Sequence, residues 1–216
     1  MVAAAGVSAY SVSLFHLMTH AFFKALLFLA AGSVIVALHH EQDIRKMGGL
    51  RTKLPITYLT SLIGSLALIG FPGFSGFFSK DALIEAIGHA DILGSGYAYA
   101  SVLIGVFITA LYTFRLFFKV FHGAQDGHHQ DVKESPLSIT LPLILLAIPS
   151  AIVAWPTVGP MVFGSYFANS ISQPDAYQIF GYEFTTAFGF LVHAFSSPVI
   201  YIAVFGVLTA YVLYIY

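Results

Sequence analysis

Two histidines and a lysine recur at intervals of four residues in a segment that is otherwise rich in Phe, Leu and Ala. They are His16, His20 and Lys24. In an α-helix, residues four positions apart are rotated by only about 40° from one another, so these side chains would form one polar row along one face. The row would place three groups that can exchange protons one helical turn apart.

A lysine in such an apolar helix carries a cost, about 2.5–3.5 kcal/mol at a helix centre on insertion scales. Burial in an apolar medium disfavours the charged form of a lysine, and histidine already exchanges protons near neutral pH. Ionisable groups inside membrane helices are functional by default. The spacing of His16, His20 and Lys24 therefore favours a proton or ion path.

Two other interpretations of this row remain open. The three side chains could serve only as polar packing between helices. His16 and His20 could instead ligate zinc, although no Glu lies between them and the metalloprotease pattern is therefore absent.

A second group of ionisable residues follows a predicted break in a long apolar run. Within Phe71–Gly76, Pro72 removes a backbone donor, and Gly73 and Gly76 accept non-helical angles. Lys80, Asp81 and Glu85 come directly afterwards. The freed backbone groups of a broken membrane helix must be buried in protein or line a hydrated cavity, as they do at transporter sites. We therefore predict that these three residues belong to the same path; the alternative is that Lys80 and Asp81 are interfacial anchors.

The composition indicates a membrane protein. Apolar residues make up 58% of the 216 positions and charged residues only 9%. A soluble domain carries roughly 25% charged residues. A net charge of −1 gives no sign of nucleic-acid binding, and the chain has no cysteine for disulfides or thiolate metal sites.

The apolar runs predict an all-α, polytopic bundle of membrane helices, because each run can hold the ~20 residues of a crossing. The runs are Ser11–Leu38, Pro55–Gly88, Tyr97–Phe121, Pro136–Trp155 and Thr186–Tyr216. Lys and Arg concentrate in the loop His39–Leu54 and in or just before the loop His122–Ser135. If Pro55–Gly88 crosses once as a broken helix, both loops share a side, which the positive-inside rule favours. We therefore expect about five crossings, with both loops facing the cytoplasm or the mitochondrial matrix.

The remaining polar residues of the sequence are predicted to have structural roles. Arg115 is predicted to anchor a helix at the interface. The loop residues His122, Asp126, His128, His129 and Asp131 could bind a metal but are better explained as a solvated loop. Ser33, Thr60, Ser61 and Ser65, with nearby glycines, are predicted to pack helices together.

Several of these segments resemble one protein family. His16–Leu29, followed by Gly32–Ile35, is similar to a characteristic segment of the proton-channel subunit of NADH:quinone oxidoreductase (respiratory complex I), the family of bacterial subunit L and mitochondrial chain 5. His39–Leu50 resembles the next loop, Gly76–Asp81 the segment after the family's broken helix, and Leu111–Arg115 the helix after that. The resemblance covers residues 6–123; beyond Ser135 it is one of hydropathy only.

The resemblance implies roles for single residues. In the family, the lysine matching Lys24 lies on the central membrane axis, and the histidines matching His16 and His20 connect toward it. The lysine matching Lys80 lies on the family's broken helix near the exit path, with an acidic neighbour at the position of Asp81. The glutamate–lysine pair of the family's first half-channel has no counterpart here. The resemblance thus implies a fragment, residues 1–216, of one antiporter-like membrane domain with its last helices at 136–216.

The implied function is proton translocation within the complex, in a bacterial inner (plasma) membrane or a mitochondrial inner membrane. No cofactor is expected in this chain; FMN, iron–sulfur clusters and quinone would belong to partner subunits. The expected partners are other membrane subunits and lipid, not nucleic acid. One alternative is a subunit of a cation/proton antiporter. Another is a membrane scaffold that does not pump.

Overall fold

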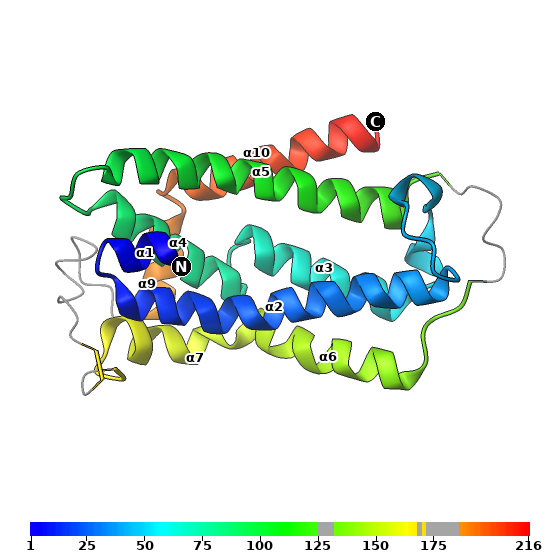
Figure 1. Cartoon of the computed structure of the whole chain (residues 1–216), viewed down its shortest axis with the longest axis horizontal. Helices are drawn as coiled ribbons and strands as arrows, with labels where there is room; N and C mark the ends of the chain where they lie inside the picture. The colour runs from blue at the N-terminus through cyan, green and yellow to red at the C-terminus, as the bar shows by residue number, and fades with distance from the viewer. Residues whose placement is uncertain (125–131, 168–169, 172–185) are drawn as a thin grey trace.

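Helices that run along one long axis make up most of the chain (Figure 1). The computed structural model describes residues 1–124, 132–167, 170–171 and 186–216, and no β-strand occurs among them. The helices are α1 (Val2–Gly6), α2 (Tyr10–Ala37), α3 (Pro55–Ile69), α4 (Ser75–Gly88), α5 (Ser95–His122), α6 (Leu137–Ile152), α7 (Ala154–Val158), α9 (Ala187–Ala194) and α10 (Pro198–Tyr214), with the 3₁₀ turns η1 (Ile44–Lys46) and η2 (Leu50–Thr52) and the π-helical turn η3 (Gly159–Phe163).

Two of these helices, α2 and α5, are each 28 residues long and apolar enough to cross a membrane alone. Two further pairs of helices are long and apolar enough to cross a membrane only when both members are taken together. They are α6 with Ala154–Phe163, bent by 45°, and α9 with α10, bent by 63°. At 15 residues α3 is too short for the ~20 that a crossing needs. However, α3 and α4 follow one another along the long axis in Figure 1, as the two halves of one broken crossing would.

The break between α3 and α4 has a defined geometry. Gly70 adopts φ 80° and ends α3, its N–H donating to the Ala67 carbonyl while the Phe71 N–H donates to that of Leu66. This Schellman arrangement satisfies the carbonyls at the helix end and favours glycine at the left-handed position. Gly73, at φ 90°, turns the chain into α4. The break therefore spans Gly70–Phe74.

Gly76 has a different role from the one predicted. It lies inside α4, so it supplies no non-helical angle. A Cβ at Gly76 would instead lie 1.8 Å from the Ala67 carbonyl oxygen. Only glycine lets the first turn of α4 approach the last turn of α3 this closely.

The loop after α2 and the described ends of the loop between α5 and α6 lie at the same end of the bundle. Figure 1 places η1 and η2 at the end where α5 finishes and α6 begins, and the α4–α5 connection at the opposite end. This arrangement agrees with the single broken crossing that the charge distribution predicts. The described helices give two crossings, or up to four if each bent pair is one, and α3 with α4 would bring the number to the predicted five.

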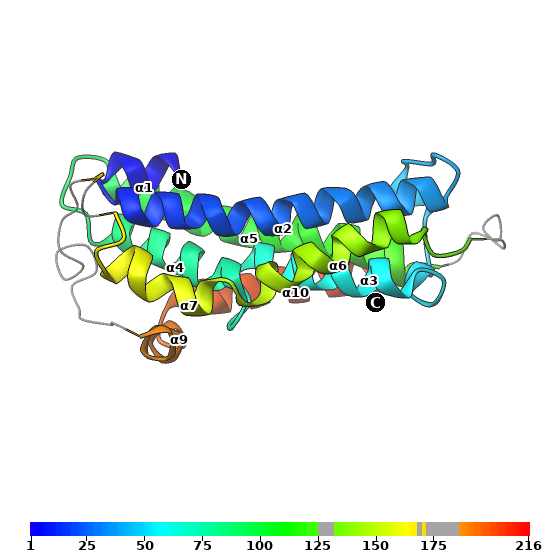
Figure 2. The ribbon, with the colours of Figure 1, turned by 90° about the horizontal axis from the view of Figure 1, so that it is seen from below.

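The last two predicted runs are bent, which the apolar pattern did not indicate. Pro136–Trp155 was expected to be one helix, but the chain bends after α6 and continues to Phe163. Thr186–Tyr216 was expected to be continuous, but α9 ends before Pro198 begins α10. Figure 2 shows α9 nearly end-on while α10 runs along the bundle. Proline at the first helical position starts a new helix rather than continuing the previous one.

Two large apolar clusters occupy the two ends of the bundle. One gathers Phe15, Phe77, Phe78 and Phe190 from α2, α4 and α9. The other gathers residues around Val34, including Leu50 and Phe117. The segment of α2 that carries His16, His20 and Lys24 runs from the first cluster toward the second.

Candidate functional site

The predicted polar row on α2 forms as the spacing requires. The rings of His16 and His20 have centroids 5.7 Å apart, and the ring of His20 meets that of Phe23 edge-on at 5.3 Å. Lys24 continues the row one turn later, its Nζ 6.0 Å from the centroid of the Phe28 ring. The three ionisable side chains are each partly buried within an apolar helix.

A hydroxyl cluster connects this row to the broken helix. Nδ1 of His16 lies 3.0 Å from Oγ of Ser79 on α4, and Oγ1 of Thr19 lies 2.6 Å from the same oxygen. Thr19 also donates to the His16 carbonyl at 3.2 Å. Thr19 and Ser79 are both fully buried. Because Ser79 precedes Lys80, the cluster brings the two predicted groups of ionisable residues together.

Asp81 is the most deeply placed carboxylate of the site, with 1% of its surface exposed. Its Oδ1 accepts a long hydrogen bond, 3.4 Å, from Ser197 at the start of α10. Its Oδ2 makes no hydrogen bond within the described part of the chain. A buried polar atom without a protein partner is costly and is usually hydrogen-bonded to an ordered water molecule.

Lys80 and Glu85 have different neighbours, although both lie on α4. Among the described residues Lys80 forms no ion pair with Asp81 or Glu85. The carboxylate of Glu85 lies 3.5 Å from Nδ1 of His89, one turn further along. The aliphatic part of Lys80 instead packs beside the break, its Cδ 3.5 Å from where a Cβ of Gly70 would lie.

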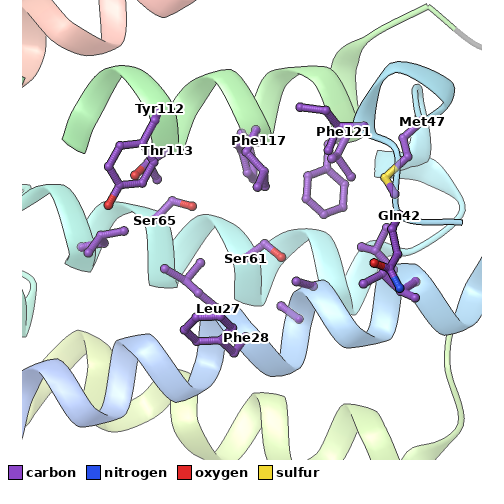
Figure 3. Close-up of a pocket in the computed structure, with 18 of the residues that line it drawn as sticks. Leu27, Phe28, Gln42, Met47, Ser61, Ser65, Tyr112, Thr113, Phe117 and Phe121 are labelled. Atoms are coloured by element: carbon purple, nitrogen blue, oxygen red, sulfur yellow. The ribbon is translucent and has the colours of Figure 1, made fainter. Parts of the chain in front are cut away.

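Lys24 also lines a cavity of about 360 Å³ between α2, α3 and α5. Figure 3 shows its lining from Tyr112 and Thr113 on α5, past Ser61 and Ser65 on α3, to Gln42 in the loop after α2. The hydroxyl of Thr113 is buried and has no hydrogen-bond partner among the described residues. Ser61 and Ser65 were predicted only to pack helices; they also face this cavity. A void this large with several polar groups has room for water.

Sequence reasoning missed one carboxylate, Glu134, and the hydroxyl groups near it, at the end of the bundle that carries the basic loops. Glu134 accepts hydrogen bonds from the backbone N–H groups of Ile56 and Thr57, at 2.7 and 3.3 Å, and from the Thr57 hydroxyl at 2.7 Å. Ser33 joins Thr57 and Ser135 through hydroxyl contacts of 2.8 Å each. A carboxylate suits the positive end of a helix, so Glu134 caps α3.

Four charged residues of the loop after α2 form two local ion pairs. Arg45 binds Asp43 at 2.6 Å and lowers the pKa of that carboxyl to about 2 by hydrogen bonding. Lys46 binds Glu41 at 2.8 Å and lowers its pKa in the same way. These carboxylates stay ionised near neutral pH and are therefore poor proton carriers.

Two further expectations concern positions outside the polar row. Arg115 and Lys119 both lie 5.6 Å from the centroid of the Tyr214 ring, a position suited to interface anchors. The loop residues Asp126, His128, His129 and Asp131 lie outside the described residues. Within the described part, no three His, Asp or Glu side chains are grouped to hold a metal ion.

This arrangement defines a class of protein. Membrane-length apolar helices, a broken crossing, and a row of ionisable groups that reaches the break are the features of a polytopic α-helical transport protein.

Comparison with known proteins identifies the family to which the chain belongs. A family model described as NADH:quinone oxidoreductase/Mrp antiporter, transmembrane, matches residues 1–111, and the chain belongs to this family. NADH-quinone oxidoreductase subunit L of Neisseria meningitidis serogroup A is 50% identical over 238 aligned positions, covering 100% of this chain and 35% of the relative. The Escherichia coli K12 subunit L is 50% identical over 165 positions, or 74% of this chain and 26% of the relative.

A mitochondrial relative is similar as well. NADH-ubiquinone oxidoreductase chain 5 of Marchantia polymorpha is 47% identical over 177 positions, covering 79% of this chain and 26% of that protein. The chain thus spans about a third or less of the length of these relatives. The match with the Neisseria protein includes the helices after Ser135, where the sequence motifs indicated similarity of hydropathy only.

Proposed function

We propose that this chain forms part of an antiporter-like, proton-translocating membrane subunit of a respiratory NADH:quinone oxidoreductase. One observation carries the proposal: a row of ionisable groups on α2 meets the start of the half-helix α4 through the contact between His16 and Ser79. Family membership and the relatives' names support the assignment to such a complex.

The proposed path runs along α2 and then across to α4. Lys24 and the two histidines exchange protons along one face, one turn apart. The Ser79 hydroxyl can accept a hydrogen bond from one partner and donate to another, so it can pass a proton between His16 and the neighbourhood of Lys80. Asp81, whose buried Oδ2 has no hydrogen-bond partner among the described residues, and Glu85 continue the path toward the end of α4.

Water in the cavity beside Lys24 would carry protons on the side of Lys24 that faces away from His16 and His20. The cavity reaches Gln42 in the loop that precedes α3, so water there would link Lys24 with the end of the bundle that carries the basic loops. The Thr113 hydroxyl, which lacks a protein partner among the described residues, would bind such a water.

The redox chemistry of the complex would take place elsewhere. This sequence has no cysteine, the usual ligand of iron–sulfur clusters. NADH oxidation, FMN, the clusters and quinone reduction are assigned to partner subunits, and this chain would contribute translocation alone. Its surroundings would be the bacterial plasma membrane or mitochondrial inner membrane, with lipid and other membrane subunits as partners.

The decisive experiment replaces the two lysines in the assembled complex. Lys24→Ala and Lys80→Ala should each reduce NADH-driven acidification of inverted vesicles strongly, with assembly intact. Lys80→Arg should fail as well, because arginine keeps its charge but cannot release a proton. Lys119→Ala, which removes a lysine outside the row, is the matched control and should pump normally. Normal pumping in an assembled Lys24→Ala complex would favour a scaffold.

A cation/proton antiporter subunit is the second candidate, because the description of the matching family names Mrp antiporters too. The two functions differ in their driving force. Transport that follows an imposed sodium gradient, and that continues without quinone reduction, would favour the antiporter.

A further inference from the structure

Two of the helix breaks in the described part of the chain, α3–α4 and α6–α7, are joined to each other by hydrogen bonds. Ser75, the first residue of α4, donates its hydroxyl to the carbonyl of Pro149 at 2.8 Å. The same hydroxyl accepts from the backbone N–H of Ala154, the first residue of α7, at 3.2 Å. One side chain at the α3–α4 break therefore spans the α6–α7 break.

Trp155 makes a second connection between the two breaks. Its indole Nε1 donates to the carbonyl of Gly73 at 2.8 Å, within the turn between α3 and α4. Its ring meets that of Phe78 edge-on, with the centroids 5.1 Å apart. Gly73 is a turn residue with no helical partner for its carbonyl, so the indole satisfies a group that the break has freed.

The hydrogen bonds of Ser75 and Trp155 form a joint between the two breaks, and this joint holds the start of α4, which carries part of the candidate site. Ser75 is completely buried and begins the helix that carries Ser79, Lys80 and Asp81 within its first two turns. A helix behaves as a rigid rod over so short a distance, so a shift at Ser75 moves these residues together. The contact between His16 and Ser79, at 3.0 Å, tolerates little displacement.

We propose that Ser75 and Trp155 are positioning residues that fix α4, and with it Lys80 and Asp81, to the bend between α6 and α7. Through this joint, any change in the angle between α6 and α7 alters the alignment of the path at α4. The proposal rests on the proposed function only for its effect on pumping; the joint itself can be tested by a chemical measurement.

The first test measures the exposure of position 80 without reference to pumping. In the full-length subunit, assembled in its complex, a cysteine at Lys80 is labelled with a water-soluble maleimide. Adding Ser75→Ala should change the labelling rate about fivefold. The loss of one ordinary hydrogen bond shifts the equilibrium between two arrangements of α4, one with position 80 more exposed than the other, by about this factor. A cysteine at Gln42, in the loop after α2, should react at an unchanged rate and so controls for general unfolding.

Ser150→Ala is the matched control for the joint. Ser150 is also fully buried at this bend, but its hydroxyl donates to Leu146 within its own helix. It should leave the labelling of position 80 unchanged, and Ser75→Thr, which keeps the hydroxyl, should restore the wild-type rate. Equal labelling rates with Ser75 and Ser75→Ala, or an equal change with Ser150→Ala, would overturn the proposal.

The second test follows the pH profile of pumping in otherwise unaltered complexes. Ser75→Ala and Trp155→Phe should displace the profile, because Lys80 and Asp81 change surroundings, whereas Ser150→Ala should not. If the Lys80→Ala complex pumps normally, the proposed function is wrong. The labelling rate then still tests whether Ser75 and Trp155 fix the position of α4. If Lys80→Ala abolishes pumping but Ser75→Ala changes neither the labelling rate nor the pH profile, only the proposal about Ser75 and Trp155 is wrong.

Discussion

The Nδ1 atom of His16 lies 3.0 Å from the hydroxyl oxygen of Ser79, 63 residues later in the chain. This contact joins the long helix α2 to the half-helix α4. Without it, the histidine–lysine row and the Lys80–Asp81 pair would be two separate groups of polar residues in a membrane. With it, they form one connected series.

Removing this connection should weaken proton transfer without unfolding the chain. Ser79→Ala deletes the oxygen shared by His16 and Thr19. We expect pumping to fall about fivefold, as for the loss of one hydrogen bond, and less than in Lys24→Ala, since water can replace part of the link. Dye-monitored acidification of inverted vesicles, normalised to the rate of NADH oxidation, measures the effect.

Thr60→Val is the control for this change. It also removes a buried hydroxyl from a membrane helix, but that hydroxyl donates to Ile56 and Thr57 carbonyls of its own helix. Pumping should stay near the wild-type level. Equal losses in Ser79→Ala and Thr60→Val would mean that the Ser79 hydroxyl has no special place in the path.

The close approach at the helix break makes a prediction about assembly. Gly76→Ala would place a methyl group 1.8 Å from the Ala67 carbonyl oxygen, and both atoms belong to helical backbone that cannot move aside locally. Overpacking of this kind costs about 1–3 kcal/mol or more. We expect little intact complex on native gels. Gly32→Ala, where nothing lies within 4 Å of the added Cβ, should assemble normally; a Gly76→Ala complex as abundant as this control would contradict the geometry.

The helices and the main break were predictable because they depend on local physics. Long apolar runs require crossings, Pro72 with Gly73 disrupts a helix, and loops rich in Lys and Arg share one side of a membrane. The bend at Phe195–Ser197 could also have been anticipated from Pro198. The ionisable members of the site stood out because a charge in an apolar helix is costly.

The uncharged members of the site could not be found in this way. Ser79, Thr19 and Thr113 are hydroxyl residues of a kind common in membrane helices, where most only pack. Ser197 contacts Asp81 across 116 residues, and Glu134 reaches Thr57 across 77, so both partnerships depend on tertiary packing. A lone glutamate in a polar loop gives no local sign that it caps a distant helix.

That cap supports the last prediction. Glu134→Ala would leave the N–H groups of Ile56 and Thr57 without their acceptor and remove a negative charge from the positive end of α3. We expect a loss of about 1–2 kcal/mol, typical of a lost helix cap, and a smaller loss for Glu134→Gln, which retains one acceptor oxygen. The fraction of complex that survives a heat step, read on native gels, measures this. Glu41→Ala, which removes a loop carboxylate paired with Lys46, should change little because surface ion pairs contribute weakly. If Glu41→Ala and Glu134→Ala were equally heat-resistant, the carboxylate of Glu134 would not stabilise α3.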